Sequence, residues 1–281
     1  MKIAIQGEPG SFSHEAALKL VPGAEIVPCS ISVEVFAALD AGKVDAAAIP
    51  IENSLAGSVL EHFDLLLAHE VKVVRETLLR IRHNLIAVPG ASIDEIERVY
   101  SHPVALAQCR RFLAAHPTMK SIAFYDTAGS VKQLMEQQDR HAGAIASDAA
   151  ARHYGAQALQ TGIEDNPENY TRFFLVLPTS ATGPEAATDP DSNKISIAFS
   201  LENRPGSLVA ALTALSAQGT NLTKIESRPV QGKPWEYIFY VDCQIAGSAA
   251  GSAEGSRALD ALREHCGMVK ELGRYREARG T

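Results

Sequence analysis

The sequence predicts an α/β protein with a large N-terminal part and a smaller C-terminal part. From Lys2 onward, short apolar strands alternate with helical segments, which is the pattern of a parallel sheet covered by helices. Residues 179–193 are rich in Thr, Ser, Pro, Gly, Asp and Ala without an apolar period, and therefore indicate a linker. After Lys194 the predicted elements follow the order βαββαβ, which is typical of a ferredoxin-like domain.

The composition limits the kinds of partner that the protein can have. Of its 281 residues, 46% are hydrophobic and 21% are charged, as in a globular protein of about two domains. A formal net charge of -7 without a clustered basic face argues against a nucleic-acid partner. No apolar run is long enough for a membrane span, and the first strand breaks at Gly7 before a signal-peptide core could form. We therefore expect a cytoplasmic protein.

The four cysteines do not indicate a metal site. Their spacing matches neither a zinc site nor a disulfide framework, and each is interpreted as a small buried apolar residue. They are Cys29, Cys109, Cys243 and Cys266.

The first elements form a βαβαβ unit. A strand over Lys2–Gln6 leads into a glycine loop, Gly7–Ser13, and then into a helix that Ser11 or Ser13 can cap. The loop lacks the three-glycine dinucleotide fingerprint, so it predicts either a plain capped turn or an anion site at the helix amides. The unit continues with a strand over Glu25–Pro28, a helix over Ser32–Ala41 and a strand over Val44–Ile49.

A polar loop follows the third strand and contains Asn53 and Ser54. In open α/β sheets, ligands bind outside the carboxyl ends of the strands, so both residues are candidates for orienting polar groups of a ligand. A simple helix cap would have the same appearance.

The chain then crosses to a second lobe through strands over Val71–Val74 and Thr77–Val88. The interleaved basic residues Arg80, Arg82 and His83 are interpreted as the solvated face of a strand.

Within the second lobe, three strands end in polar residues at a helix start. Ser101 and His102 follow the strand over Ile96–Tyr100, and Thr127 and Ser147 lie in two later turns of the same kind. A histidine in such a place is as consistent with a structural role as with a catalytic one. Together these loops predict a cleft that binds a small polar anion.

The stretch Asn166–Leu175 combines a polar loop with the start of a buried strand. At the strand mouth, Arg172 offers a donor fork suited to a carboxylate, and Thr171 offers a hydroxyl. The alternative is a strand entrance with a surface arginine.

The small domain is expected to hold strands over Ile195–Leu201, Asn221–Pro229, Trp235–Cys243 and Val269–Tyr275, with helices over Gly206–Gln218 and Arg257–His265. The Gly/Ala/Ser-rich stretch from Ala246 to Ser256 is predicted to be a flexible loop.

Taken together, these motifs resemble the prephenate dehydratase family with a C-terminal ACT regulatory domain. The resemblance rests on Gly7–Ser13, Pro50–Ser54, Ser101–Pro103 with Gln108 and Cys109, and Asp165 with Asn169–Phe173. In the small domain it rests on Glu202–Val209 and Glu226–Pro229. Ser207 stands where family members often have alanine.

The resemblance implies a catalytic domain over residues 1–178 with the two lobes of a type 2 periplasmic binding protein. One lobe would comprise residues 1–76 and 165–178, the other residues 77–164, and the ACT domain would span 194–277. It implies conversion of prephenate to phenylpyruvate, carbon dioxide and water, which needs no metal or organic cofactor. Because Met1 opens directly into the first dehydratase strand, a fused chorismate mutase domain is expected to be absent.

The resemblance also assigns the site residues. Thr171 becomes the catalytic residue, and His102 the titratable candidate for relaying a proton. Arg172 would bind a carboxylate, and Phe173 would form an apolar wall. The other substrate-binding candidates are Asn53, Ser54, Ser101, His102, Gln108, Thr127, Ser147 and Asn169.

For the ACT domain the implied ligand is L-phenylalanine, as an allosteric inhibitor bound between paired small domains, so that a homodimer or homotetramer is expected. The effector-binding candidates are Asn203, Pro205, Gly206, Ser207, Leu208, Leu222, Glu226, Ser227 and Arg228. Two alternatives stay open: an arogenate dehydratase, and a non-enzymatic sensor of small anions or amino acids.

Overall fold

The computed structural model describes residues 1–230, 235–246 and 249–278. By its contacts the chain divides into two compact units. Unit 1 comprises Met1–Val59 and Leu78–Phe173, and unit 2 comprises Leu60–Thr77 and Phe174–Thr281. The division runs through strands β5 (Val71–Arg80) and β11 (Tyr170–Pro178), so each unit holds one part of both strands.

Unit 1 begins with a small parallel sheet. β1 (Lys2–Gln6) lies between β2 (Glu25–Cys29) and β3 (Ala46–Asn53) and pairs with both in parallel. The connecting helices, α1 (Phe12–Leu20) and α2 (Ser32–Asp40), pack on this first sheet because their apolar sides are buried against it. The short strand β4 (Gly57–Ser58) pairs with the end of β3, so the chain turns back at Asn53.

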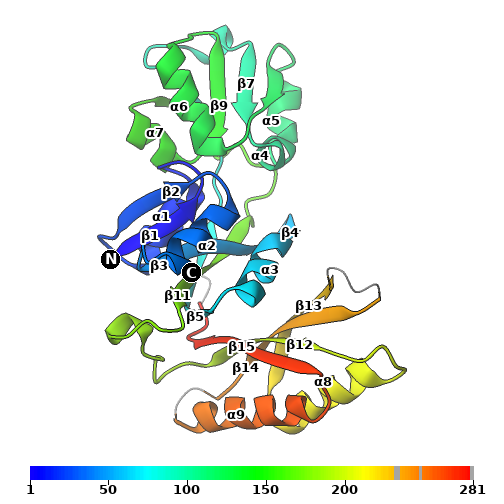
Figure 1. Cartoon of the computed structure of the whole chain (residues 1–281). Helices are drawn as coiled ribbons and strands as arrows, with labels where there is room; N and C mark the ends of the chain where they lie inside the picture. The colour runs from blue at the N-terminus through cyan, green and yellow to red at the C-terminus, as the bar shows by residue number, and fades with distance from the viewer. Residues whose placement is uncertain (231–234, 247–248, 279–281) are drawn as a thin grey trace. The chain divides into compact units, whose positions relative to one another are not determined.

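The second sheet of unit 1 has the order β10-β6-β9-β7-β8, and Figure 1 labels its strands β7 and β9. Helix α6 packs against β9, and α7 packs against β10. The strands are β6 (Asn84–Ala87), β7 (Arg98–Ser101), β8 (Lys120–Ala123), β9 (Ala142–Ala146) and β10 (Gln157–Thr161). The helices are α4 (Pro103–Ala107), α5 (Arg110–Ala115), α6 (Thr127–Gln137) and α7 (Asp148–Tyr154), with a 3-10 turn at Ile93–Glu95.

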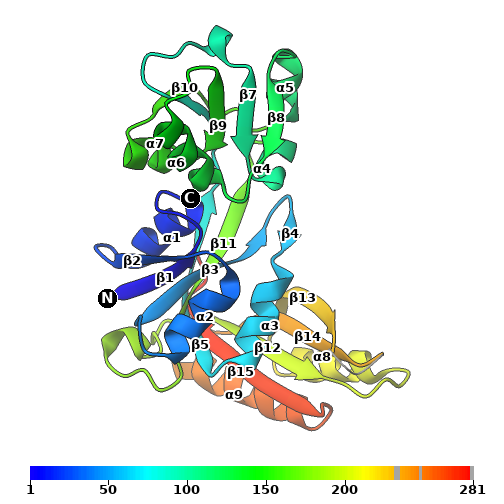
Figure 2. The same cartoon turned by 45° about the horizontal axis from the view of Figure 1, so that its top comes forward.

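Unit 2 contains the βαββαβ domain. Its strands form the order β13-β14-β12-β15, and α8 and α9 lie side by side on one face (Figures 1 and 2). The elements are β12 (Lys194–Ser200), α8 (Ser207–Ala217), β13 (Asn221–Pro229), β14 (Tyr237–Gln244), α9 (Ala249–Arg263) and β15 (Met268–Tyr275). The predicted α/β class and the ferredoxin-like order are therefore confirmed.

Helix α3 (Leu60–Ala68) also belongs to unit 2. Lys270 Nζ on β15 donates to the carbonyl oxygens of Leu66, Leu67 and His69 at 2.8–3.2 Å. A cation at a helix C-terminus offsets the partial negative charge of the last carbonyls. Lys270 thus fastens the end of α3 to the sheet.

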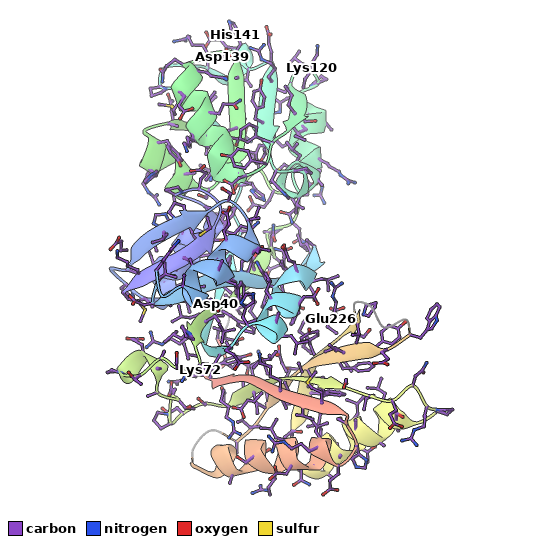
Figure 3. All side chains as sticks on the ribbon, viewed as in Figure 1. Asp40, Lys72, Lys120, Asp139, His141 and Glu226 are labelled. Atoms are coloured by element: carbon purple, nitrogen blue, oxygen red, sulfur yellow. The ribbon has the colours of Figure 1, made fainter. Side chains whose placement is uncertain are left out.

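Residues 179–193, predicted as a linker, pack within unit 2. Lys72 on β5, labelled in Figure 3, donates to the carbonyl of Ala186 at 2.9 Å, and Arg75 pairs with Glu185. Ala186 is buried, and a 3-10 turn spans Pro184–Ala186. The predicted domain boundaries themselves stay a prediction.

The predicted flexible loop over Ala246–Ser256 is wrong for most of its length, because α9 begins at Ala249; residues 247 and 248 lie outside the described residues. Alanine favours a helix, and Ala258, Leu259 and Leu262 give the same helix a buried apolar side. Glycine at position 255 also has a packing reason, because a Cβ there would lie only 3.3 Å from the Arg274 guanidinium.

A candidate active site around Thr171

Thr171 is the second residue of β11, and only 8% of its surface is exposed. Its hydroxyl oxygen lies 2.9 Å from Nδ2 of Asn53, at the end of β3. The two residues are distant in sequence, but β3 ends at one of the polar loops singled out by the sequence and β11 begins at the other. Unit 1 therefore brings the predicted catalytic residue together with a predicted orienting residue.

The contacts of Asn53 determine which way its amide points. Its Oδ1 accepts from the backbone N–H groups of Leu55 and Ala56 at 3.0 and 2.8 Å, and backbone N–H groups only donate. The Nδ2 group must then face Thr171 and donate to its hydroxyl oxygen. A hydroxyl that accepts one hydrogen bond keeps its own hydrogen for another partner. The site thus prepares Thr171 as a donor.

Asn169 links Thr171 to the second sheet. Its Oδ1 accepts from Asn53 Nδ2 at 2.7 Å, and its Nδ2 donates to Gln108 Oε1 at 3.0 Å. The same Gln108 oxygen lies 2.9 Å from Nε2 of His83. Asn169 has no exposed surface, and burial lowers the pKa of His83 because a charged imidazole would lose its hydration. These bonds form a continuous polar chain from Thr171 to His83.

His83 is a functional candidate that the sequence interpretation missed. We predicted a solvated strand face for it, but the structure exposes only 2% of its surface, so that prediction is wrong. The Phe12 ring lies edge-on to the imidazole at 5.7 Å between centroids, and the His83 backbone N–H donates to Glu164. The only signal in the sequence was the position of His83 two residues before the apolar run that starts at Leu85.

Ser54 fastens the site loop rather than facing a cavity. Its hydroxyl donates to the Glu168 carbonyl at 2.9 Å and accepts from the Tyr170 N–H at 3.0 Å, and its own N–H donates to the Tyr170 carbonyl. Arg80 holds the same loop by donating to the Pro167 carbonyl. These contacts keep residues 167–170 against β3.

Arg172 and Phe173 continue β11 beyond Thr171. Side chains alternate along a strand, so Arg172 points to the face opposite to Thr171 and Phe173. Arg172 is largely buried and lies 3.2 Å from Glu52, which neighbours Asn53 on β3. Phe173 is also buried. The predicted carboxylate contact of Arg172 stays a prediction, and in this structure the guanidinium faces an anionic partner of the protein itself.

Ser101 and Ser147 are buried, and both hydroxyls donate to carbonyl groups. Ser101 donates to Ile145 at 2.6 Å, and Ser147 donates to Gly10 at 2.7 Å while it caps α7. Thr127, the first residue of α6, is partly exposed. The contacts of these three residues with a substrate stay predictions.

Two cavities lie in unit 1. One, of about 470 Å³, is lined by Gln108 and Asn169 of the polar chain, together with Leu55, Ala56, Val104, Ala107, Arg110, Glu164, Asp165 and Asn166. The other, of about 540 Å³, is lined by Gln6, Gly7, Glu8, Ser13, Pro28, Cys29, Ser30, His102, Tyr125 and Asp126. His102, the predicted proton relay, therefore lines the cavity that does not include Asn169.

An acidic group borders the larger cavity, and the sequence interpretation did not single it out. Glu8 accepts from Tyr125 at 3.0 Å and pairs with Lys132 at 3.1 Å. Burial, followed by the nearby Glu8 charge, raises the pKa of Asp126, and burial together with the Glu8 contact raises the pKa of Tyr125 to about 12. This end of the cavity suits a cation better than an anion.

Gly10 allows the two sheets of unit 1 to approach each other. A Cβ at Gly10 would lie 2.7 Å from the Ala150 Cα, and the residue has a φ of +84°. Such an approach requires glycine, because the clash is with backbone. The glycine loop predicted from the sequence is therefore a contact surface for the start of α7.

The effector candidates lie on α8, its preceding loop and β13 in unit 2. Gly206 caps α8 with a φ of +84°, and Asn203, Pro205 and Gly206 are exposed. Arg228 makes two hydrogen bonds to the Asp64 carboxylate of α3, one of them from Nε at 3.2 Å. The remaining candidates, Ser207, Leu208, Leu222, Glu226 (labelled in Figure 3) and Ser227, are partly or fully exposed.

In the described residues no group of acidic, histidine or cysteine side chains is arranged to hold a metal ion. Over the same residues, no helix has both the length and the apolar character that a membrane span requires.

The fold and the site define a two-sheet α/β catalytic unit followed by a ferredoxin-like domain. Residues 3–180 match the Prephenate dehydratase family and residues 195–250 match the ACT domain family. The chain belongs to the prephenate dehydratase family, whose members are carbon–oxygen lyases. The family predicted from the motifs is thus confirmed.

Among named relatives, arogenate dehydratase 2 of Petunia hybrida is 39% identical over 98% of this chain and 71% of its own length. The structure of a prephenate dehydratase in complex with L-Phe from Arthrobacter aurescens is 32% identical, covers 99% of this chain and 90% of its own, and gives a TM-score of 0.87. A third structure, GqqA, described as a novel type of quorum quenching acylases, is 31% identical, covers 99% and 98% of the two chains, and gives a TM-score of 0.88.

Proposed function

We propose that the protein is a prephenate dehydratase that forms phenylpyruvate, carbon dioxide and water, with Thr171 as its catalytic residue. The observation that carries this proposal is the hydrogen bond from Asn53 Nδ2 to the Thr171 hydroxyl, which leaves the hydroxyl hydrogen for a substrate. Family membership over residues 3–180 supplies the reaction class. The Arthrobacter relative is named for the same activity.

The proposed reaction makes a limited demand on the protein. The bond between the ring and its carboxylate breaks, its electron pair enters the ring, and the carbon–oxygen bond of the ring hydroxyl breaks on the opposite side. The departing hydroxide takes one proton and becomes water, so one proton is consumed per turnover. Aromatisation drives the process, and the enzyme lowers the barrier by stabilising the charge that develops on the leaving oxygen.

In this proposal Thr171 donates a hydrogen bond to the leaving oxygen. An alcohol is a poor acid near neutral pH, so the transferred proton ultimately comes from solvent rather than from Thr171. Gln108 and Asn169 bind the substrate from the smaller cavity, which they line. Asn53 orients Thr171, and Ser54 holds the loop; Arg172, Phe173, Ser101, His102, Thr127 and Ser147 complete the proposed set.

Substitutions at Thr171 test the proposal. Thr171→Val keeps the shape and removes the hydroxyl, so we expect kcat to fall by about 10²–10³-fold, as for other lost donors to a developing oxyanion. Thr171→Ser keeps the hydroxyl and should retain a measurable part of the turnover. If Thr171→Val forms phenylpyruvate at the parent rate, Thr171 is not the catalytic residue.

Arogenate is the second candidate substrate, and one observation favours it. Arogenate carries an ammonium group where prephenate has a keto group, and Glu8 and Asp126 give the larger cavity an acidic end. The Petunia relative is also named an arogenate dehydratase. Parallel assays with both substrates decide between them, since phenylpyruvate and phenylalanine are different products. A third assay with an acylated amine tests the activity named for GqqA.

The ACT domain leads us to propose that L-phenylalanine is an allosteric inhibitor. The match over residues 195–250 and the L-Phe complex of the Arthrobacter relative support this assignment. The effector would bind between paired small domains, which requires a dimer or a tetramer. Initial rates that stay constant up to saturating L-phenylalanine would remove the regulatory part of the proposal and leave the catalytic part intact.

A further inference from the structure

His83 ends the polar chain that begins at Thr171, and no step of the proposed reaction uses it. The chain runs from Thr171 to Asn53, Asn169, Gln108 and His83, with donor–acceptor distances of 2.7–3.0 Å. Asn53 ends β3 and Thr171 lies in β11, whereas Asn169 directly precedes β11, Gln108 follows α4 and His83 directly precedes β6. The His83 imidazole at the end of this chain is almost completely buried.

The direction of every hydrogen bond in this chain follows from one fixed point. The backbone N–H groups of Leu55 and Ala56 donate to Asn53 Oδ1, which leaves Asn53 Nδ2 to donate to Asn169 Oδ1. The amide of Asn169 must then present Nδ2 to Gln108, whose Oε1 accepts.

Because Gln108 Oε1 can only accept, its second partner, His83 Nε2, must carry a hydrogen. The chain therefore specifies the tautomer of His83 with its hydrogen on Nε2.

The surroundings of His83 agree with a neutral ring in that tautomer. The side chain is 2% exposed, and Nδ1 has no hydrogen-bond partner among the described residues. Desolvation lowers the pKa of the imidazole, and it exceeds the opposing effects of Gln108 and Glu164. Phe12 covers the ring edge-on. A protonated ring would place a buried charge next to Phe12, whereas a neutral one needs only the bond to Gln108.

We propose that His83 is a positioning residue that keeps the Thr171 hydroxyl pointed at the substrate. Its Nε2–H fixes the Gln108 carbonyl oxygen, Gln108 fixes Asn169, and Asn169 shares Asn53 Nδ2 with Thr171. If the first bond is lost, Gln108 and Asn169 gain freedom to rotate their amides. An Asn169 amide turned the other way presents a donor to Asn53 and disturbs the bond that orients Thr171. This role rests on the proposed function of Thr171.

Substitutions at His83 test whether this residue affects the rate of the reaction. His83→Met fills the site without a donor, and we expect kcat to fall about tenfold to hundredfold. His83→Gln can place an amide N–H near the position of Nε2 and should restore most of the rate. In a Thr171→Val background, His83→Met should lower kcat no further, because the group it positions is absent.

Two results of these kinetic measurements would contradict the proposal. An unchanged kcat in His83→Met overturns the proposal, and so does an equal additional loss in the Thr171→Val background, because a purely structural effect would add. Circular dichroism and the thermal midpoint of each variant show whether it folds. If the parent enzyme turns over neither prephenate nor arogenate, the proposed function fails, and the kinetic test does not apply.

A spectroscopic measurement tests the inference without activity. In the protein labelled with ¹⁵N in its histidines, the His83 signal, assigned by its disappearance in His83→Gln, should show one protonated nitrogen at the Nε2 position at pH 7. An Nδ1–H tautomer, or a doubly protonated ring, overturns the proposal even if the substitutions reduce activity.

Discussion

Replacing Asn53 by aspartate keeps the shape of the side chain, turns its donor atom into an acceptor and adds a negative charge. In the parent, Nδ2 of Asn53 donates to the Thr171 hydroxyl at 2.9 Å and to Asn169 Oδ1 at 2.7 Å, and it approaches the Tyr170 carbonyl at 3.2 Å. In Asn53→Asp an anionic oxygen takes its place. The other oxygen still accepts from the backbone of Leu55 and Ala56, as Oδ1 does now.

The hydroxyl of Thr171 must then turn its hydrogen toward the introduced carboxylate, because a carboxylate only accepts. The leaving oxygen of the substrate loses its donor. Removal of one such donor costs about 2.7–4 kcal/mol of transition-state stabilisation, or about 10²–10³ in kcat. We therefore expect Asn53→Asp to lose about as much turnover as Thr171→Val, although it keeps the hydroxyl.

Steady-state formation of phenylpyruvate over a range of prephenate concentrations measures this effect, and the double variant Asn53→Asp/Thr171→Val should be no slower than Thr171→Val alone. A matched control is Asn84→Asp, which makes the same chemical change at a buried asparagine bonded to Ala146 and Gly162. It should lower the thermal midpoint without a comparable loss of kcat. A kcat within threefold of the parent for Asn53→Asp would refute the orientation argument.

Three further predictions concern stability and regulation. Lys194→Met removes the ammonium from the buried Glu76 carboxylate and should lower the unfolding free energy in urea by about 3–5 kcal/mol, most of which a second change, Glu76→Leu, should restore. Because burial lowers the pKa of His83, the unfolded chain binds more protons than the folded chain between pH 6.5 and that lowered pKa. Stability should therefore decrease as the pH falls through this range, with a limiting slope of about 1.4 kcal/mol per pH unit for one proton, and His83→Gln should remove this contribution. Arg228→Lys keeps the charge but loses the two-bond contact with Asp64, and should weaken inhibition by L-phenylalanine about tenfold in a dose–response assay.

The elements could be predicted from the sequence because each carries its own period. β1, β2 and β13 lie within a residue of their predicted positions, and α8 lies within a residue of the predicted helix over Gly206–Gln218 at each end. Asn53 could be nominated because it lies where a strand gives way to a polar loop, and Thr171 because it lies where a polar loop enters a strand. Local patterns suffice for statements of this kind.

The chain of hydrogen bonds could not be predicted in this way. It joins four segments that are far apart in sequence, and the direction of each amide depends on the next. His83 shows the same limit, because its burial depends on Phe12 from the first helix rather than on the strand that contains it. The stretch after Ala246 was misread for a different reason: low complexity was given more weight than the helix propensity of alanine and the apolar side that begins at Ala258.

The arrangement around Thr171 explains how a residue with no useful acidity could serve this reaction. Its hydroxyl receives a hydrogen bond from an amide, the amide is held by other amides, and the chain ends in an imidazole that burial keeps neutral. A titratable acid at the same place would have to be protonated to act, and its contribution would depend on pH. A hydroxyl with a fixed direction supplies the same donor at every pH at which the fold is stable, and solvent supplies the proton after the carbon–oxygen bond has weakened. The amides and the neutral histidine thus orient the Thr171 hydroxyl, which can then act as a hydrogen-bond donor without being a strong acid.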